Sequence, residues 1–280
     1  MALTEKEIAT LTETAWKIRR DVVLTTQWAG GGHIGGGLSQ VEILVALYFH
    51  YMKLDPENPQ WEDRDRLVLS KGHGGVGLAP VLAERGFFSR ELLKTFNHTG
   101  SPFGMHLDRL KVKGLDASTG SLGHGLPIAV GLALGARLQN KSWRTYCIMG
   151  DGELAEGSIW EGAMAAAHYK LSNLTGFVDR NMHCIDGCTE DVMAVEPIGD
   201  KWAAFGWNVL DCDGHDFMAL GEAIEKAQQV EDKPTVIICR TVKGKGVDYM
   251  EDKPEWHYGG LDTVKAEEAL KSIDRMYGKA

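Results

Sequence analysis

One segment of this chain, residues 145–187, restricts the fold more than any other. The apolar run Thr145–Met149 ends at a Gly-Asp-Gly triplet centred on Asp151, and a second apolar run, Leu174–Val178, ends three residues before Asn181. Short apolar runs bounded by glycine and polar residues predict buried strands. The segment therefore predicts two strands of an open α/β sheet, each followed by a polar residue.

A helix is predicted between these two strands. Ser158-Ile-Trp-Glu161 has the Ser-x-x-Glu form of a capping box, and small apolar residues follow it toward Tyr169. In open α/β sheets, ligands lie beyond the carboxyl ends of the strands. We therefore expect Asp151 and Asn181 to lie together at a binding edge of the sheet.

The residue types at this edge suit Mg²⁺ bound to a diphosphate. Mg²⁺ takes a near-octahedral shell of oxygens at about 2.0–2.1 Å and uses one or two protein carboxylates, while phosphate and water complete the shell. Asp151 and Asn181 fit that requirement, and backbone N–H groups near Gly152 can offset phosphate charge although the chain has no P-loop. Because the chain has 34 glycines, the triplet alone can arise by chance, but its combination with the strands and Asn181 favours a binding site.

Length and composition restrict the class of protein. A chain of 280 residues, 44% of them hydrophobic, can bury a large core, and we expect residues 1–280 to form a single domain. The net charge of −9 argues against nucleic-acid binding. An 18-residue apolar run and a signal-peptide core are both absent, which predicts a soluble, cytoplasmic protein without a membrane partner. The five cysteines contain no Cys-x-x-Cys pair, so we expect free thiols.

The rest of the chain alternates between predicted helices and strands. Thr4 and Ser39 each begin a capping-box pattern and predict helices that follow them. The other expected elements are strands at Arg66–Ser70 and Pro234–Thr241, and helices at Ser89–Phe96, near Phe217–Ile224 and from about Asp262. This alternation predicts a doubly wound, mostly parallel sheet with helices on both faces.

Four further motifs carry a family resemblance: Gly32–Gly36, Leu69–Gly74, Ser118–Gly125, and Arg240–Gly246 followed by Glu255-Trp-His257. Together with the Gly-Asp-Gly and Asn181 signature, and in the same order, they resemble the N-terminal, diphosphate-binding half of transketolase. The resemblance spans nearly the whole chain. It implies the thiamine diphosphate-binding α/β fold, known as the PP domain, and a cofactor pair of thiamine diphosphate and Mg²⁺.

The resemblance also implies which residues hold the cofactor. The metal ligands would be Asp151, Asn181 and the backbone carbonyl of His183, with Ca²⁺ or Mn²⁺ as substitutes for Mg²⁺, and the His183 imidazole would point elsewhere. Ile185 would pack against the thiazolium, and Gly120 with Leu122 against the aminopyrimidine, although Leu122 also suits an ordinary core position. The cofactor-binding set is His73, Gly120, Leu122, Gly150, Asp151, Gly152, Asn181, Ile185 and His257.

Four histidines match catalytic positions of the family. His73 and His257 would contact the diphosphate and face the reacting carbon. His33 and His106 would hydrogen-bond the ketose hydroxyls and pass protons, a role that suits imidazole near neutral pH. Around His106 the chain departs from the family, which usually has Gly-His-Pro-Glu, and without the proline the backbone of this loop is less restricted. Substrate preference depends on this loop.

Glu156 and His124 lie near the expected site with less definite roles. In the family, the carboxylate at the Glu156 position lies at a subunit interface with acids of the partner, where a proton can be shared. The alternative is a solvated glutamate at a helix start, which the helix dipole favours. His124 is expected near the cofactor, with no role assigned.

The resemblance implies that this chain is incomplete as a catalyst. The glutamate that activates the cofactor, the aromatic ring that stacks on its pyrimidine and the arginines that bind sugar phosphate all belong to the second half of the family's enzymes. The expected function is therefore that of the N-terminal subunit of a two-chain transketolase, a transferase of carbohydrate metabolism that moves a glycolaldehyde unit from a ketose to an aldose. A C-terminal subunit would complete an α₂β₂ heterotetramer. The alternatives are a subunit related to deoxyxylulose phosphate synthase or to a 2-oxo acid dehydrogenase, and a non-catalytic cofactor-binding homologue.

Overall fold

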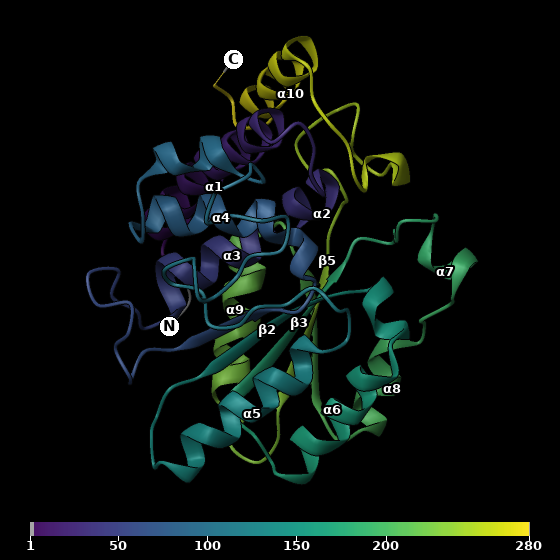
Figure 1. Cartoon of the computed structure of the whole chain (residues 1–280). Helices are drawn as coiled ribbons and strands as arrows, with labels where there is room; N and C mark the ends of the chain where they lie inside the picture. The colour runs from purple at the N-terminus through teal and green to yellow at the C-terminus, as the bar shows by residue number, and fades with distance from the viewer. Residues whose placement is uncertain (1–2, 280) are drawn as a thin grey trace.

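The computed structural model describes residues 3–279 and is built around a five-stranded sheet (Figure 1). Its strands are β1 Arg66–Leu69, β2 Thr145–Gly150, β3 Leu174–Arg180, β4 Asn208–Asp213 and β5 Thr235–Arg240. They follow the order β1-β2-β3-β5-β4, and every neighbouring pair is parallel. Gly150 pairs with Asp179 and Asp179 with Cys239, so three central strands end at one level. The predicted parallel sheet is confirmed, and β4 is an edge strand that the sequence did not predict.

Helices cover both faces of this sheet (Figure 1). One face carries α1 Glu5–Trp28, α2 Ile34–Ser39, α3 Val41–Ala46, α4 Gly75–Arg85, α9 Phe217–Gln228 and α10 Thr263–Met276. The other carries α5 Gly125–Leu138, α6 Gly157–His168 and α8 Ile198–Ala204, and the single turn α7 is Thr189–Val192. Short 3₁₀ or π turns span Leu47–Tyr51, Gly72–Gly74, Arg90–Thr95, Gly152–Ala155 and Pro254–Trp256. This three-layer arrangement leaves the carboxyl ends of the strands to be covered by loops.

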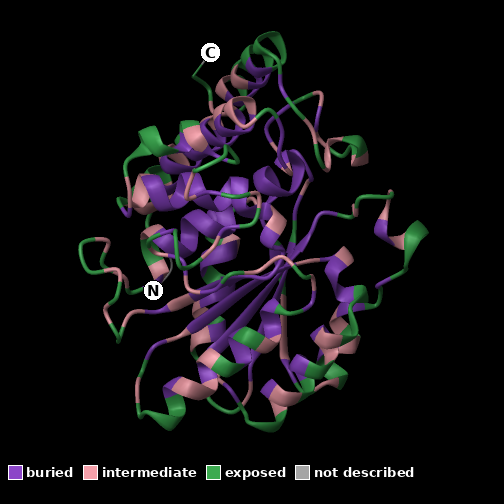
Figure 2. Ribbon diagram, in the orientation of Figure 1, coloured by how far each residue is buried: buried purple, intermediate pink, exposed green. Residues whose placement is uncertain are grey.

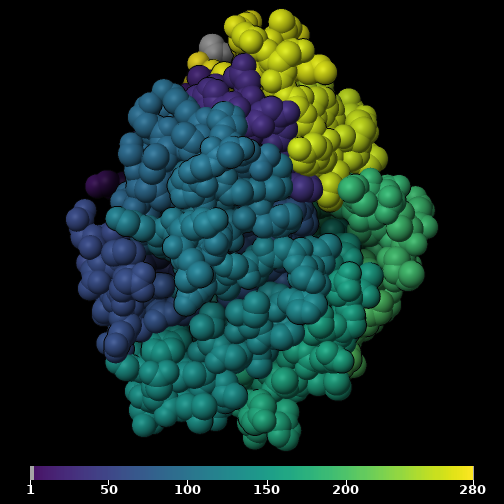
Figure 3. All heavy atoms as spheres, viewed as in Figure 1, coloured from purple at the N-terminus to yellow at the C-terminus, as the bar shows by residue number. Residues whose placement is uncertain are grey.

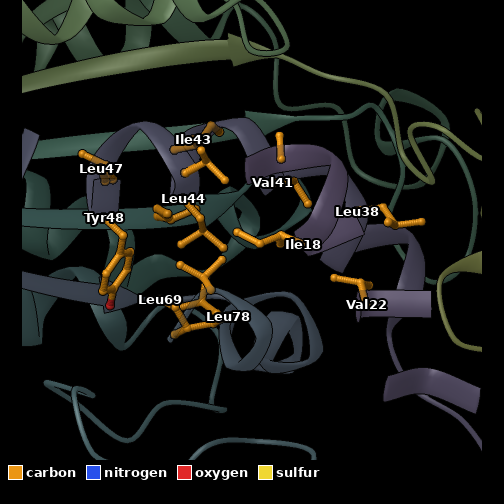
Figure 4. Packing of buried hydrophobic residues seen from close by; sticks show 14 of the residues in the cluster. Ile18, Val22, Leu38, Val41, Ile43, Leu44, Leu47, Tyr48, Leu69 and Leu78 are labelled. Carbon is orange, nitrogen blue, oxygen red and sulfur yellow. The ribbon is translucent and has the colours of Figure 1, made fainter. Parts of the chain in front are cut away.

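The core forms one hydrophobic cluster on each face of the sheet. Because side chains alternate along a strand, Ile148 faces the cluster under α1 to α4, whereas its neighbours Cys147 and Met149 face the cluster under α5 and α6. Figure 4 shows the first cluster, in which Ile18 of α1 packs among side chains of α2, α3 and β1. The sheet is buried throughout its centre, and exposed residues concentrate on the outer helix surfaces and loops (Figure 2).

The two ends of the chain pack against each other. The C-terminal α10 lies along the N-terminal α1, and the two segments are adjacent in the space-filling view (Figure 3). Asp274 accepts a hydrogen bond of 2.8 Å from the Trp16 indole and pairs with Arg20, which fixes this contact.

None of the helices within residues 3–279 combines the length and the apolar character that a membrane-spanning helix needs.

Of the three expected capping boxes, only one forms. Thr4 and Glu7 cap α1 reciprocally as predicted. The helix predicted after Ser39 is present as α3, but its capping box is wrong, because Ser39 is the last residue of α2 and its buried hydroxyl donates instead to Asp179 at 2.6 Å. The Ser158 prediction is also wrong in detail, because α6 begins two residues earlier than a Ser158 cap requires, with Glu156 at the N-cap and no side-chain cap. The segment Ser89–Phe96 forms a short 3₁₀ turn rather than an α-helix.

Candidate functional site at the carboxyl ends of the strands

Charged or amide side chains that follow four neighbouring strands line one cavity. Lys71 follows β1, Asp151 follows β2, Asn181 follows β3 and Lys243 follows β5, and all four line a cavity of about 310 Å³. Each of the four is at most 4% exposed. Ligands of open α/β sheets lie at such strand ends.

The cavity brings together nearly all of the site residues predicted from the sequence. Its lining includes His33, His73, His106, Gly120, Leu122, Gly150, Asp151, Gly152, Asn181, His183, Ile185 and His257. Glu156 is not part of the lining; it is exposed at the N-cap of α6. The same lining contains residues that sequence reasoning did not assign, namely Gly36, Lys71, Glu153, Cys184 and Lys243.

Asp151 is fixed by donors on both of its carboxylate oxygens. Its Oδ1 accepts from the Gly152 N–H at 2.9 Å, and its Oδ2 accepts from the Met182 N–H at 2.7 Å and from Arg180 Nη1 at 3.1 Å. Burial raises the pKa of Asp151, the nearby Asp179 adds to this, and Arg180 opposes it. A carboxylate has about four acceptor sites, two on each oxygen, so Oδ1, which accepts one hydrogen bond, keeps a lone pair for a cation.

Asp179, whose register partner on β2 is Gly150, forms a buried ion pair with Lys71. Asp179 also accepts from Ser39, from the Thr241 hydroxyl and from Asn181 Nδ2, the last at 3.1 Å. Burial alone would raise the pKa of Asp179, but the Lys71 ammonium and these donors hold it below its ordinary value. The bond to Asn181 also orients that amide, so that its Oδ1 is directed away from Asp179.

Lys243 is a buried cation whose hydrogen-bond partners among the described residues are all neutral. Its Nζ lies 2.9 Å from the His183 carbonyl oxygen, 3.4 Å from that of Cys184 and 2.8 Å from Nδ1 of His257. Burial, and secondarily the charge of Lys71, lowers the pKa of Lys243 to about 8. A buried ammonium that is not paired with a carboxylate attracts an anion to the cavity.

The oxygen donors at this end fit Mg²⁺ better than a transition metal. The cavity offers one carboxylate from Asp151, the Asn181 amide and the His183 carbonyl, which is the hard-oxygen set that Mg²⁺ shares with phosphate and water. Within residues 3–279, no group of three or more His, Cys, Asp or Glu side chains could hold a metal. The His183 imidazole turns away from this set, as expected, and pairs with Asp252 at 2.8 Å.

Four histidines from four different loops meet at the other end of the cavity. The ring of His33 lies 4.9 Å from that of His73, 5.4 Å from that of His257 and 6.4 Å from that of His106, measured between centroids. The His73 and His257 rings are stacked. Nδ1 of His33 is buried, with no hydrogen-bond partner among the described residues. This group can therefore bind a ligand without giving up an existing bond.

Burial keeps three of these imidazoles neutral, those of His33, His73 and His257. It lowers the pKa of His33 to about 4, with a contribution from His106, and that of His73 to about 2, with a contribution from Lys71. Burial and the charge of Lys243 lower the pKa of His257 to about 3. Because Lys243 donates to Nδ1 of His257, the neutral ring carries its proton on Nε2. Neutral imidazoles can both donate to and accept from hydroxyl groups.

The loop that carries His106 has Leu107 where the family has proline, and Asp108 holds the turn that follows. Asp108 accepts hydrogen bonds from the Leu110 N–H at 3.0 Å and from the Ser118 hydroxyl at 3.1 Å, and buried Leu107 anchors the turn. Gly120 lies against the His106 ring, where an added Cβ would stand 3.1 Å from Cδ2. The close approach of backbone to imidazole therefore depends on a glycine at that position.

Apolar side chains line the cavity and its surroundings. Leu122 is half-buried and belongs to neither core cluster, so the core alternative for Leu122 is wrong. Ile185 is 64% exposed although it lines the cavity, and on the same segment Val192 and Met193 are 45% and 64% exposed. Large apolar side chains exposed together are typical of an interaction surface.

Comparison with known proteins agrees with this site. A sequence model of the family described as transketolase, thiamine diphosphate binding domain, matches residues 11–278. A 6-deoxy-6-sulfo-D-fructose transketolase subunit of Clostridium sp. (strain MSTE9) is 47% identical and covers 88% of this chain and 90% of its own length. An apulose-4-phosphate transketolase subunit of Phocaeicola vulgatus is 41% identical and covers 98% of this chain and 97% of its own length.

Solved structures give the same fold. Transketolase from Leishmania mexicana matches with a TM-score of 0.89 at 29% identity, covering 96% of this chain and 41% of that protein. Transketolase from Campylobacter jejuni matches with a TM-score of 0.86 at 30% identity, covering 99% of this chain and 43% of that protein. The chain thus spans less than half the length of these two transketolases. It belongs to the transketolase family and corresponds to the family's thiamine diphosphate-binding domain.

Proposed function

We propose that this protein is the diphosphate-binding subunit of a two-chain transketolase, which transfers a glycolaldehyde unit from a ketose to an aldose with thiamine diphosphate and Mg²⁺. The observation that carries the proposal is one cavity in which Asp151, Asn181 and Lys243 lie at one end and four histidines at the other. The first group suits a metal diphosphate, and the second suits a polyhydroxylated substrate. We also propose that residues 1–280 act as one domain.

The charged end of the cavity would hold the diphosphate. Asp151, the Asn181 amide and the His183 carbonyl would bind Mg²⁺, and the backbone around Gly150 and Gly152 would approach the phosphates. Lys243 would pair with a phosphate oxygen, which would give its buried ammonium a counter-charge. Its present bond to the His183 carbonyl connects the metal site to the phosphate site.

The histidine end would hold the sugar. Bound thiamine diphosphate supplies a carbanion that adds to a ketose carbonyl and keeps the two-carbon fragment. His33 and His106 would orient the ketose hydroxyls, and His73 and His257 would face the reacting carbon. His33, His73 and His257 would act as neutral donors and acceptors. Proton transfer by such positioned side chains typically contributes ~10²–10⁴ in rate. Hydroxyl-binding imidazoles favour a ketose over the 2-oxo acid of related enzymes.

The cavity needs a second chain to close it. Ile185, Gly120 and Leu122 provide one apolar wall for the cofactor, and the exposed side chains of Val192 and Met193 leave a surface for a partner. The two subunit relatives cover nearly the same length as this chain, whereas the solved transketolases extend well beyond it. A C-terminal subunit would supply the missing walls and the glutamate that activates the cofactor, in an α₂β₂ assembly. Glu156 would meet the partner there.

The relatives suggest an unusual ketose. The names of the two subunit relatives specify a sulfonated fructose and apulose 4-phosphate. The His106 loop, which has Leu107 in place of proline and a turn held by Asp108, would adapt the sugar end of the cavity to such a substrate. We therefore include both of these ketoses, with common sugar phosphates, in the test below.

The test is reconstitution. The purified chain with Mg²⁺, thiamine diphosphate and a ketose–aldose pair should show no ketol transfer, because the cofactor would lack its activating glutamate. Adding a purified C-terminal transketolase subunit encoded beside this gene should restore transfer and produce a complex with two copies of each chain by light scattering. Enzymatic turnover by the isolated chain would contradict the two-chain assignment. Decarboxylation of a 2-oxo acid by the mixture would contradict the transketolase assignment.

A further inference from the structure

The position of Lys243 depends on the loop that carries it. This loop, residues 241–246, follows β5 and turns at Gly244, whose φ of +75° favours glycine. The Gly244 N–H donates to the Gly35 carbonyl at 3.0 Å. Holding the backbone of this loop in place lowers the conformational entropy that the loop would lose when Lys243 binds a phosphate.

His215, which lies outside the cavity, binds this loop one residue before Lys243. The Val242 N–H donates to Nε2 of His215 at 2.9 Å. Nε2 is therefore the unprotonated nitrogen, and the ring proton lies on Nδ1, which is 2.8 Å from a Glu42 carboxylate oxygen. The imidazole thus connects a buried carboxylate to the backbone of the lysine loop.

Arg19 completes a buried group that holds the loop at two points. Its Nη2 pairs with Glu42 at 2.6 Å, and its Nη1 donates to the Lys245 carbonyl at 2.7 Å and to the Leu38 carbonyl at 2.8 Å. Arg19 is fully buried and Glu42 is 2% exposed. The Arg19–Glu42–His215 group therefore bonds the loop on both sides of Lys243, at Val242 and at Lys245.

We propose that His215 is a positioning residue for cofactor binding: through its bond to the Val242 N–H, it holds the Lys243 ammonium where the diphosphate binds. The inference rests on the proposed function, since it needs thiamine diphosphate as the ligand. It gives the Arg19–Glu42–His215 group a role in ligand affinity as well as in stability. His215 itself touches neither cofactor nor substrate.

Two variants of His215 separate positioning from simple stabilisation. The amide of glutamine in His215→Gln reaches the position of Nε2, so it can accept from Val242 but loses the bond to Glu42. The amide of asparagine in His215→Asn lies near the position of Nδ1, so it keeps the bond to Glu42 but leaves Val242 without its acceptor. Tyr277→Phe is the matched control, because the Tyr277 hydroxyl bonds Arg19 and Glu42 but not the loop.

The experiment is calorimetric titration of each purified full-length chain with thiamine diphosphate at saturating Mg²⁺, together with its thermal unfolding without ligand. His215→Asn should weaken the cofactor Kd about tenfold, the effect expected for one lost hydrogen bond, at a Tm near that of the unmutated chain. His215→Gln should bind within about twofold of the unmutated chain at a lower Tm. Tyr277→Phe should lower Tm and leave affinity unchanged.

Two results would overturn the proposal: unchanged affinity in His215→Asn, or a tenfold loss in His215→Gln. If the asparagine variant does not fold, His215→Gln decides alone, because retained affinity with reduced Tm supports positioning through Val242. If the unmutated chain itself fails to bind thiamine diphosphate, the proposed function fails, and that failure is distinct from a failure of the His215 variants.

Discussion

The two ends of the cavity are built in different ways. At the diphosphate end, Lys71, Asp151 and Asn181 follow directly from strands, and ion pairs and backbone N–H groups fix their positions. At the sugar end, His33 and its three neighbours come from separate loops and meet mainly through ring contacts. From this difference we expect the strand ends to provide cofactor affinity and the loops to provide substrate preference and turnover.

The largest expected effect is at the diphosphate end. Asp151→Ala should weaken Mg²⁺-dependent binding of thiamine diphosphate on the order of 100-fold or more, because the metal loses its one carboxylate ligand. Calorimetry on the isolated chain measures this directly. Asp151→Asn, which keeps the shape of the side chain, should bind nearly as weakly.

The matched control for these variants is Asp191→Ala, which removes an exposed carboxylate on α7. It should leave cofactor affinity unchanged. Wild-type affinity in Asp151→Ala would show that the metal assignment is wrong.

A smaller effect on binding is expected at the sugar end. In the reconstituted enzyme, His106→Ala should lower kcat/KM for the ketose by roughly 10²-fold, within the range of positioned acid–base groups, and change cofactor Kd by less than about twofold. His98→Ala, which removes an exposed histidine eight residues earlier in the same connecting segment, is the control. An equal loss of cofactor binding and turnover in His106→Ala would contradict the expectation that the histidine loops affect turnover and not cofactor affinity.

The smallest effect concerns stability and pH. Folding lowers the pKa of His73 from 6.5 to about 2, so below pH 6.5 the unfolded chain binds a proton that the folded chain does not. Stability from this group is complete above pH 6.5 and is lost as pH falls toward 2. Between pH 7.5 and 5.5, the Tm of the chain without ligand should fall, and His73→Asn should reduce that fall by roughly one third, because three buried histidines share it.

The control is His98→Asn, which removes no buried imidazole and should keep the wild-type slope. A His73→Asn variant with the same pH slope as the unmutated chain would mean that His73 titrates normally in the folded state.

The site could be predicted from the sequence because its motifs lie directly after predicted strands. Asp151 and Asn181 could be placed at one edge from the apolar runs before them, and the parallel sheet brings them together. The roles of Lys71 and Lys243 were missed although both lie in motifs that were recognised. Lysine is usually solvated, and only the fold shows Lys71 paired with Asp179, 108 positions away.

Other errors have the same origin in long-range contacts. Ser39 has the local signature of a helix cap, but its hydroxyl bonds Asp179, 140 positions away. The edge strand β4 was missed, and its mixed burial pattern is weaker than that of the central strands. His215 stands in a polar turn in the sequence, and only the structure shows its bonds to Glu42 and Val242.

The most direct test of the central claim is competition by a ligand that has only the diphosphate end. We expect Mg²⁺-pyrophosphate to displace thiamine diphosphate from the isolated chain, since in the proposed function Asp151, Asn181 and Lys243 would provide most of the affinity and the partner would complete the pyrimidine site. Unphosphorylated thiamine should not displace it. Calorimetric displacement titrations measure both. Displacement by thiamine but not by pyrophosphate would contradict the assignment of this chain as the diphosphate-binding half.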